Sequence, residues 1–192
     1  MAIIEFRKIP KRIFQFRIDI KGAKPPIWRR VQVKENITFE EFHYIIQNCF
    51  EWMNTHLHQF YLDEDSIITD TENEFYEQVY PNEYNETKIK LNDVFKNEGD
   101  KLEYEYDFGD SWVHVIKLES ILEEKKGQYY PYMLAGRRTA PFEDCGGIWG
   151  WEDICRNEDF GYFGKEDIEM KNEIFKDWKE YLEQEKEMKN MY

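Results

Sequence analysis

The alternation of apolar and polar side chains along residues 13–21 constrains the fold more than any other feature of this chain. One face carries Phe14, Phe16, Ile18 and Ile20, and the opposite face carries Gln15, Arg17, Asp19 and Lys21. A side-chain period of two is that of a half-buried strand. After a break at residues 22–26, Val31 and Val33 resume the pattern, so residues 13–34 predict a β-hairpin.

A helix is predicted over about residues 39–52. Thr38 can accept a hydrogen bond from the first helix amides and Glu41 can reach back, the arrangement called a capping box. The apolar residues that follow keep helical spacing: Phe39, Phe42, Ile46, Cys49, Phe50 and Met53. His43 lies near the centre of this apolar face, and we expect it in the core.

A second hairpin is predicted from alternation at residues 101–108, a turn at Gly109-Asp110 and a strand from Trp112 to Glu119. Residues 56–62 and 129–135 also indicate strands. Residues 91–95 and 151–156 favour short helices, and an amphipathic helix is predicted over about 166–186.

The predicted order, β-β-α-β-β-β-β-α, favours an α+β fold with a mainly antiparallel sheet and helices packed on one side. We expect residues 1–192 to form a single domain: a core region over 13–157 and a C-terminal amphipathic helical extension over 158–192. Residues 63–87 hold nine carboxylates and no basic residue, and we expect a long acidic loop there. One core is expected from Phe14, Phe16, Ile18, Val31, Phe39, Phe42, Ile46, Phe50 and Tyr104.

The net charge of −14 is unevenly distributed, because residues 1–34 hold ten lysines and arginines against two carboxylates. Such a basic arm can contact nucleic acid, and the candidate contacts are Lys8, Lys11, Arg12, Arg29 and Arg30. A solvated charged face of a hairpin is the alternative. Since the rest of the chain is acidic and repels phosphate, we expect weak, salt-sensitive binding at most.

Neither a membrane span nor a secretory signal is evident in the sequence, since no stretch approaches the roughly 20 apolar residues of a spanning helix. The three cysteines form no C-x-x-C pair, which argues against a disulfide framework and a zinc knuckle. A cytoplasmic protein is the expectation. Cys145 follows Glu143 and Asp144, and negative neighbours disfavour a reactive thiolate.

Imidazoles and carboxylates gather in a few short segments. We expect the strand over 56–62 to lie near the second hairpin, which would bring His56 and His58 towards His114. The candidate polar cluster comprises His56, His58, Asp107, Asp110, His114, Glu143 and Asp144. If a metal is present, the three histidines are its expected ligands. The alternative is that each imidazole is hydrogen bonded structurally, and no cofactor is predicted beyond an optional divalent metal.

The register of the second hairpin depends on its loop length. A loop of two or four residues would place Glu105 across from His114 and Asp107 across from Trp112, whereas a three-residue loop would change the pairing. In the following segment, Gly146-Gly147 permits positive φ or a close backbone approach.

Four motifs in order resemble the pRi-plasmid ORF-three-like family, also labelled a transposable-element passenger protein family. They are Pro-Ile-Trp-Arg-Arg at 26–30, Trp-Met-Asn-Thr-His-Leu-His-Gln-Phe at 52–60, Tyr-Asp-Phe-Gly-Asp-Ser-Trp-Val-His at 106–114 and Pro-Phe-Glu-Asp-Cys-Gly-Gly at 141–147. Phe142 departs from the family pattern, which has a second proline there. The resemblance implies an α+β fold and an association with plasmids and mobile elements, without an activity.

Three functions follow as hypotheses. The first is a binding or accessory module without catalysis of its own, whose partner, including a protein partner, the sequence leaves open. The second is a metal-dependent hydrolase using the polar cluster. The third is weak nucleic-acid binding through the basic hairpin.

Overall fold

The computed structural model describes residues 11–73, 75–157 and 163–189. Its elements along the chain are β1 (Arg12–Ile20), β2 (Trp28–Lys34), α1 (Phe39–Phe50), β3 (His58–Tyr61), β4 (Ser66–Thr69), β5 (Asn82–Asn85), α2 (Leu91–Val94), β6 (Lys101–Tyr106), β7 (Trp112–Glu123), β8 (Tyr132–Arg137), α3 (Gly147–Asn157), α4 (Lys165–Lys176) and α5 (Trp178–Lys189).

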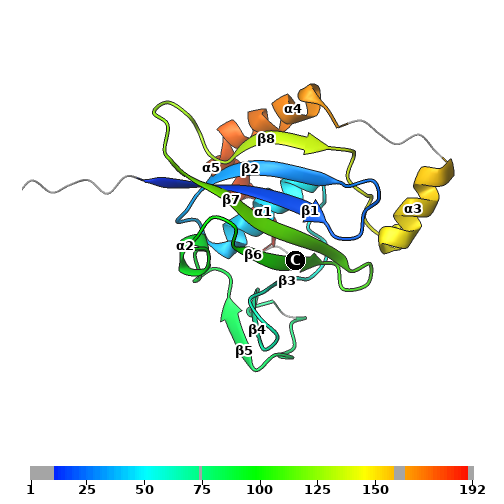
Figure 1. Cartoon of the computed structure of the whole chain (residues 1–192). Coiled ribbons are helices and arrows are strands. Elements are labelled where there is room, and N and C mark those ends of the chain that lie inside the picture. Colours follow the sequence, from blue (N-terminus) through cyan, green and yellow to red (C-terminus); the bar gives the residue numbers. More distant parts are fainter. Residues whose placement is uncertain (1–10, 74, 158–162, 190–192) are drawn as a thin grey trace, which may run out of the picture.

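The strands form one eight-stranded sheet in the order β5-β4-β3-β6-β7-β1-β2-β8 (Figure 1). Neighbours pair antiparallel except β4 and β5, which are parallel. The predicted α+β class and mainly antiparallel sheet are confirmed. Both hairpins form, and β3 pairs with β6 as expected.

A single cluster of buried apolar side chains contains all nine residues predicted for the core. Phe16 packs against Phe42 and Phe95, and Phe60 packs against Phe39 and Tyr104. His43, at 1% exposure, lies in this interior as expected. Burial of so many aromatic rings is the main stabilising contribution, because each removes a large apolar area from water.

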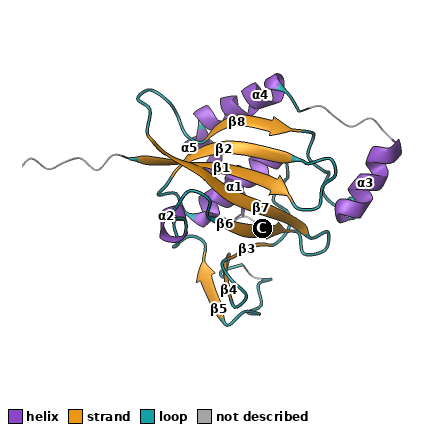
Figure 2. Cartoon of the chain, viewed as in Figure 1, coloured by secondary structure: helices purple, strands orange, loops and turns teal. Residues whose placement is uncertain are grey.

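Helix α1 is buried on both sides: eleven of its twelve residues are buried. The sheet covers one side, and Figure 2 shows the helix behind the strands. Helix α5 is also hydrogen bonded to α1. Trp178 Nε1 donates to Glu41 Oε1 at 3.0 Å, and Lys186 Nζ donates to Glu40 Oε2 at 2.5 Å. Thus residues of α5 hold α1 through its first turn.

Two expectations about secondary structure were incomplete. The acidic segment 63–87 contains the short strands β4 and β5, which extend the sheet beyond β3. Four-residue strands are too short to reveal a periodicity in sequence. The predicted helix over 166–186 is two helices, because the backbone at Asp177 leaves the helical conformation with φ −104° and ψ 30°.

The topology places different loops at the two ends of the sheet. Since neighbouring strands are antiparallel, β6 and β8 end where β3 begins. We call this the three-loop end, made by residues 51–57, 107–111 and 138–146. At the opposite end, β2 and β7 finish, α1 begins, and the connection 124–131 leads into β8. No helix among the described residues has the length and apolar character to cross a membrane.

Candidate functional site

Side chain–backbone hydrogen bonds join the loops of the three-loop end to one another. Met53 N donates to Glu143 Oε2 at 2.9 Å, and Trp52 Nε1 donates to the Pro141 carbonyl at 2.9 Å. The Tyr106 hydroxyl accepts from Thr55 N at 3.0 Å. It also donates to Glu143 Oε1 at 2.5 Å, so Tyr106 connects segments 51–57 and 138–146 from the end of β6.

The loop 107–111 is tied to the loop 138–146 by a further bond. Gly146 N donates to Asp110 Oδ2 at 3.1 Å. Within the loop, Asp107 Oδ1 accepts from Gly109 N at 3.0 Å and from Asp110 N at 3.3 Å. These bonds orient the Asp107 carboxylate and leave Oδ2 directed towards His56.

His56, Asp107 and Asp144 form a compact cluster, with one candidate ligand atom from each within 4.8 Å of the others. His56 Nε2 lies 3.4 Å from Asp144 Oδ1 and 3.8 Å from Asp107 Oδ2. The Nε2 atom is shielded from solvent and has no hydrogen-bond partner. The Asp107 side chain is 9% exposed and that of Asp144 is 76% exposed, so the cluster is closed on one side and open on the other.

Left-handed backbone is concentrated in these loops. Among the described residues, six non-glycine positions have positive φ, and all six lie at the three-loop end: Glu51, Asn54, Asp107, Ser111, Arg138 and Asp144. Asn and Asp tolerate this region better than most residues, but it still costs conformational energy. Two of the cluster's three residues, Asp107 and Asp144, therefore have left-handed backbone, and hydrogen bonds within the loop 107–111 hold Asp107 in it.

The glycines at 146 and 147 serve both purposes expected from the sequence. Their φ values are +89° and +65°. A Cβ at Gly147 would lie 2.4 Å from the Asp110 carbonyl oxygen. The loop 138–146 therefore packs backbone to backbone on the loop 107–111, which a larger residue would prevent.

His58 does not join the cluster. It begins β3, stacks on His43 with 3.4 Å between ring centroids, and its Nε2 lies 2.6 Å from Glu86 Oε2. Glu86 is fully buried. Burial, followed by the neighbouring His58, holds the pKa of His43 well below its ordinary value. His43, His58 and Glu86 thus form a buried polar network that joins α1 to β3.

His114 is also separate. The pairing of Glu105 with His114, expected for a loop of two or four residues, does not form, and the register is that of the alternative with an odd loop length. The loop 107–111 has five residues, so Tyr104 pairs with His114 and Tyr106 pairs with Trp112. His114 lies on the inward face of β7 with Trp112 and Ile116, where it is fully buried. Its Nδ1 lies 2.9 Å from the Trp112 carbonyl, and burial lowers the pKa of His114 to about 3. The three histidines are therefore not brought together as a ligand set.

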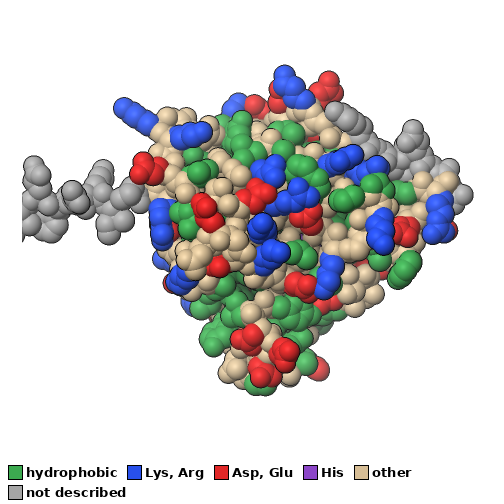
Figure 3. Space-filling view, viewed as in Figure 1, with side chains coloured by type: hydrophobic (Ala, Val, Ile, Leu, Met, Phe, Trp, Pro, Cys, Tyr) green, Lys and Arg blue, Asp and Glu red, His purple; other side chains and the backbone are tan. Residues whose placement is uncertain are grey.

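The basic residues of the first hairpin are largely paired or buried. Arg29 is fully buried, where its Nε donates to the Cys49 carbonyl near the end of α1. Arg30 makes two bonds to Glu119, at 2.6 and 2.8 Å. Arg12 pairs with Glu35 at 2.5 Å, and Lys11 lies 3.9 Å from Glu124. Lys8 lies outside the described residues. Figure 3 accordingly shows blue side chains interspersed with red ones across this face.

Cys145 lies among carboxylates of the three-loop end. Burial, then the nearby Asp110, raises the pKa of its thiol to about 11. This direction agrees with the expectation of an unreactive thiol, although burial rather than charge is the larger cause.

The protein is thus of the α+β class, with one mainly antiparallel sheet, and the loops at one end of this sheet carry the cluster of His56, Asp107 and Asp144. The chain belongs to the plasmid pRiA4b ORF-3-like protein family, whose model matches residues 12–187. It is 28% identical over 145 residues to the uncharacterized protein y4hQ of Sinorhizobium fredii (strain NBRC 101917 / NGR234), covering 74% of this chain and 71% of that protein. A solved protein of unknown function, MM3350 from Methanosarcina mazei Go1, is similar with a TM-score of 0.74 and 35% identity, covering 84% of this chain and 99% of that one.

The family assignment confirms the resemblance carried by the four motifs. Three of these motifs supply the loops of the three-loop end, and the first supplies Arg29 beneath it. Sequence reasoning missed Tyr106 and Trp52 as connecting residues. Their signal was available, since each is the first residue of a motif that is rich in polar residues, and buried tyrosine and tryptophan need polar partners.

Proposed function

We propose that this protein is a non-catalytic binding module that holds a divalent cation between His56, Asp107 and Asp144. The observation that carries the proposal is the buried His56 Nε2, which lacks a hydrogen-bond partner and faces two carboxylates. A buried polar atom in a native structure ordinarily has a partner. A cation placed between the three groups would supply it.

The distances support this role. Ligand atoms at roughly 2.1 Å from a tetrahedral ion are separated by roughly 3.4 Å. His56 Nε2 and Asp144 Oδ1 already have that separation. Asp107 Oδ2 lies 3.8 Å from His56 Nε2, and the candidate ligand atoms of the two carboxylates lie within 4.8 Å of each other, so the carboxylates would move closer together on binding. One imidazole and two carboxylates suit borderline and hard ions such as Zn²⁺ and Mn²⁺.

A metal-dependent hydrolase would use the same residues, since three protein ligands leave a position for water. We favour binding without catalysis because a cleft of ligand-sized volume among the described residues lies at the opposite end of the sheet and is lined by none of the three candidate ligands. No observation specifically favours nucleic-acid binding, since Arg29 and Arg30 are already engaged within the protein.

Metal titration of the full chain tests the proposal. Calorimetry with Zn²⁺ and with Mn²⁺, after chelator treatment, is expected to give one equivalent bound by the wild type. His56→Ala and Asp144→Asn should each weaken binding at least ten-fold. Asp65→Asn, which removes an exposed carboxylate from the β3–β4 turn, is the matched control and should bind like the wild type. Absence of saturable binding of both ions, or unchanged binding by His56→Ala, would reject the proposal.

A further inference from the structure

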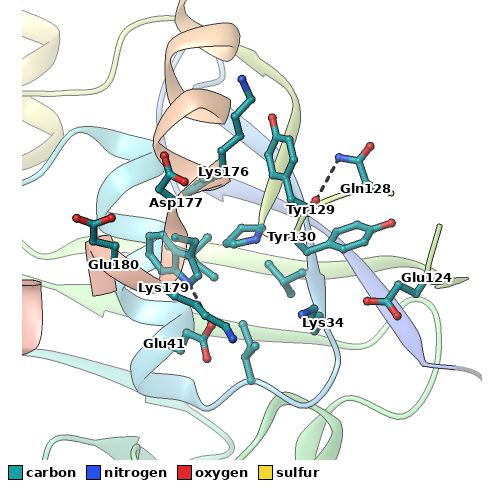
Figure 4. Close-up of a pocket in the computed structure, with 16 residues that line it drawn as sticks. Lys34, Glu41, Glu124, Gln128, Tyr129, Tyr130, Lys176, Asp177, Lys179 and Glu180 are labelled. Carbon is teal, nitrogen blue, oxygen red and sulfur yellow. Dashed lines mark hydrogen bonds between the residues drawn. The ribbon is translucent and has the colours of Figure 1, made fainter. Parts of the chain in front are cut away.

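A cleft of about 380 Å³ lies at the end of the sheet remote from the three loops. Four segments that are distant in sequence line it: the end of β2, the first half of α1, the connection 124–131 and the junction of α4 with α5 (Figure 4). Ligand sites in proteins span about 300–1,000 Å³. This volume is near the lower limit, which indicates a small ligand.

The cleft combines an apolar and aromatic lining with charged groups. Tyr129 and Tyr130 come from the connection before β8, and Trp178 from the start of α5. Trp178 is 4% exposed and packs against Phe175, so its ring is fixed in place. Aromatic walls of this kind bind apolar groups and organic ammonium ions.

Glu41 is the inner acidic group of the cleft. Thr38 caps the helix as predicted by accepting from Glu41 N at 3.1 Å, whereas the Glu41 carboxylate bonds to Trp178. The pKa of Glu41 is raised, with burial as the largest cause. A carboxylate with one indole bond retains acceptor capacity, and a cationic group in the cleft would offset its lost solvation.

Positive groups are also present. Lys34 and Lys179 line the cleft, and Lys176 does so too but is held by Glu173 at 2.6 Å. A purely cationic ligand would meet repulsion from Lys34 and Lys179. A purely anionic one would meet repulsion from Glu41 and from the outer carboxylates of the lining, those of Glu124, Asp177 and Glu180. A ligand carrying both charges matches both sets.

We propose that this cleft binds a small zwitterion of the amino-acid type with an apolar side chain. Glu41 faces its ammonium group, Lys34 and Lys179 face its carboxylate, and the aromatic lining accommodates its side chain. The proposal goes beyond the cation site, because the two sites share no residue.

The test uses four probes with the full chain: L-phenylalanine, L-leucine, phenethylamine without the carboxylate, and 3-phenylpropanoate without the ammonium group. Calorimetry and Trp fluorescence should show saturable binding of at least one amino acid. Each single-charge analogue should bind at least ten-fold more weakly than L-phenylalanine or, if only L-leucine binds, should not bind at all.

Variants make the assignment specific. Glu41→Gln keeps an acceptor for Trp178 and should reduce amino-acid binding at least ten-fold, whereas Glu64→Gln, an exposed change in the β3–β4 turn, should leave it unchanged. Circular dichroism confirms that both variants are folded. The proposal is overturned if neither amino acid binds, if a single-charge analogue binds equally well, or if Glu41→Gln binds like the wild type. Zn²⁺ titration of Glu41→Gln, expected to match the wild type, separates this outcome from failure of the cation site.

Discussion

The two ends of α1 are built on different principles. At the three-loop end, hydrogen bonds between the loops, together with residues of positive φ, hold the cluster of imidazole and carboxylate groups in place. At the cleft end, aromatic and aliphatic side chains from four segments surround an open volume, with Trp178 to Glu41 as the main polar link. The difference teaches that one scaffold can preorganise a small-ion site at one end while leaving room for a larger ligand at the other.

Replacing the anchoring tryptophan of each end should give the largest effects. Trp52 stacks on Tyr106 with 5.1 Å between centroids and bonds to the Pro141 carbonyl. Trp52→Ala should lower the free energy of unfolding by about 3–5 kcal/mol in urea titrations and abolish cation binding, because the three loops lose a shared support. Trp178→Ala should cost a similar amount but affect only the amino-acid cleft.

The comparison fails if either variant, measured where circular dichroism shows it folded, loses binding at both ends to the same degree. Trp52→Phe provides a milder check. It retains most of the ring packing but removes the indole donor, so it should cost only about 1 kcal/mol.

A matched pair of glycine variants sharpens the contrast in rigidity. Gly147 and Gly127 both have positive φ, at +65° and +82°. A Cβ at Gly147 would meet the Asp110 carbonyl, whereas at Gly127 it would meet nothing within 4 Å. Gly127→Ala should therefore cost about 1 kcal/mol from backbone strain alone.

Gly147→Ala should cost about 2 kcal/mol or more and weaken cation binding, since the loop 138–146 must move away from the loop 107–111. Chemical denaturation and metal titration of both variants check this. Equal losses of stability would show that the three-loop end is no more closely packed than the connection before β8.

The smallest expected effect concerns pH at the cleft end. The folded-state pKa of Glu41 is raised by burial, so its ionisation destabilises the folded state. The wild type should therefore gain stability relative to Glu41→Gln as the pH falls from neutral through that raised pKa. Thermal melting of both proteins across this range is the measurement. If the wild type instead loses stability relative to Glu41→Gln as the pH falls, the pKa of Glu41 in the folded protein is lowered and not raised.

Sequence patterns predicted what depends on local periodicity. The alternation in residues 13–34 gave the first hairpin, and it also contained the position of Arg29, which shares its face with Val31 and Val33. Taking Arg29 as a surface contact overlooked that parity.

The site was only partly predictable, because its assembly depends on loop length and on distant residues. The register of the second hairpin depends on the length of the loop 107–111, which the sequence leaves open, whereas the inward position of His114 follows from its alternation with Trp112 and Ile116. His58 is diverted by Glu86, which lies 28 residues away in the acidic segment. His56, Asp107 and Asp144 were among the candidates, but their convergence follows from the pairing of β3 with β6 and the packing at Gly147.

The enclosure of α1 on both sides has a consequence for the order in which the newly made chain can mature. Residues 1–157 contain the sheet and α1, yet one flank of that helix is completed only by α4 and α5. During synthesis this flank of α1 therefore stays in contact with water until α4 and α5, which follow all eight strands in the chain, have been made. Packing of these two helices on α1 is then a late step of folding, and before that step the open flank is a surface through which partly folded chains can associate.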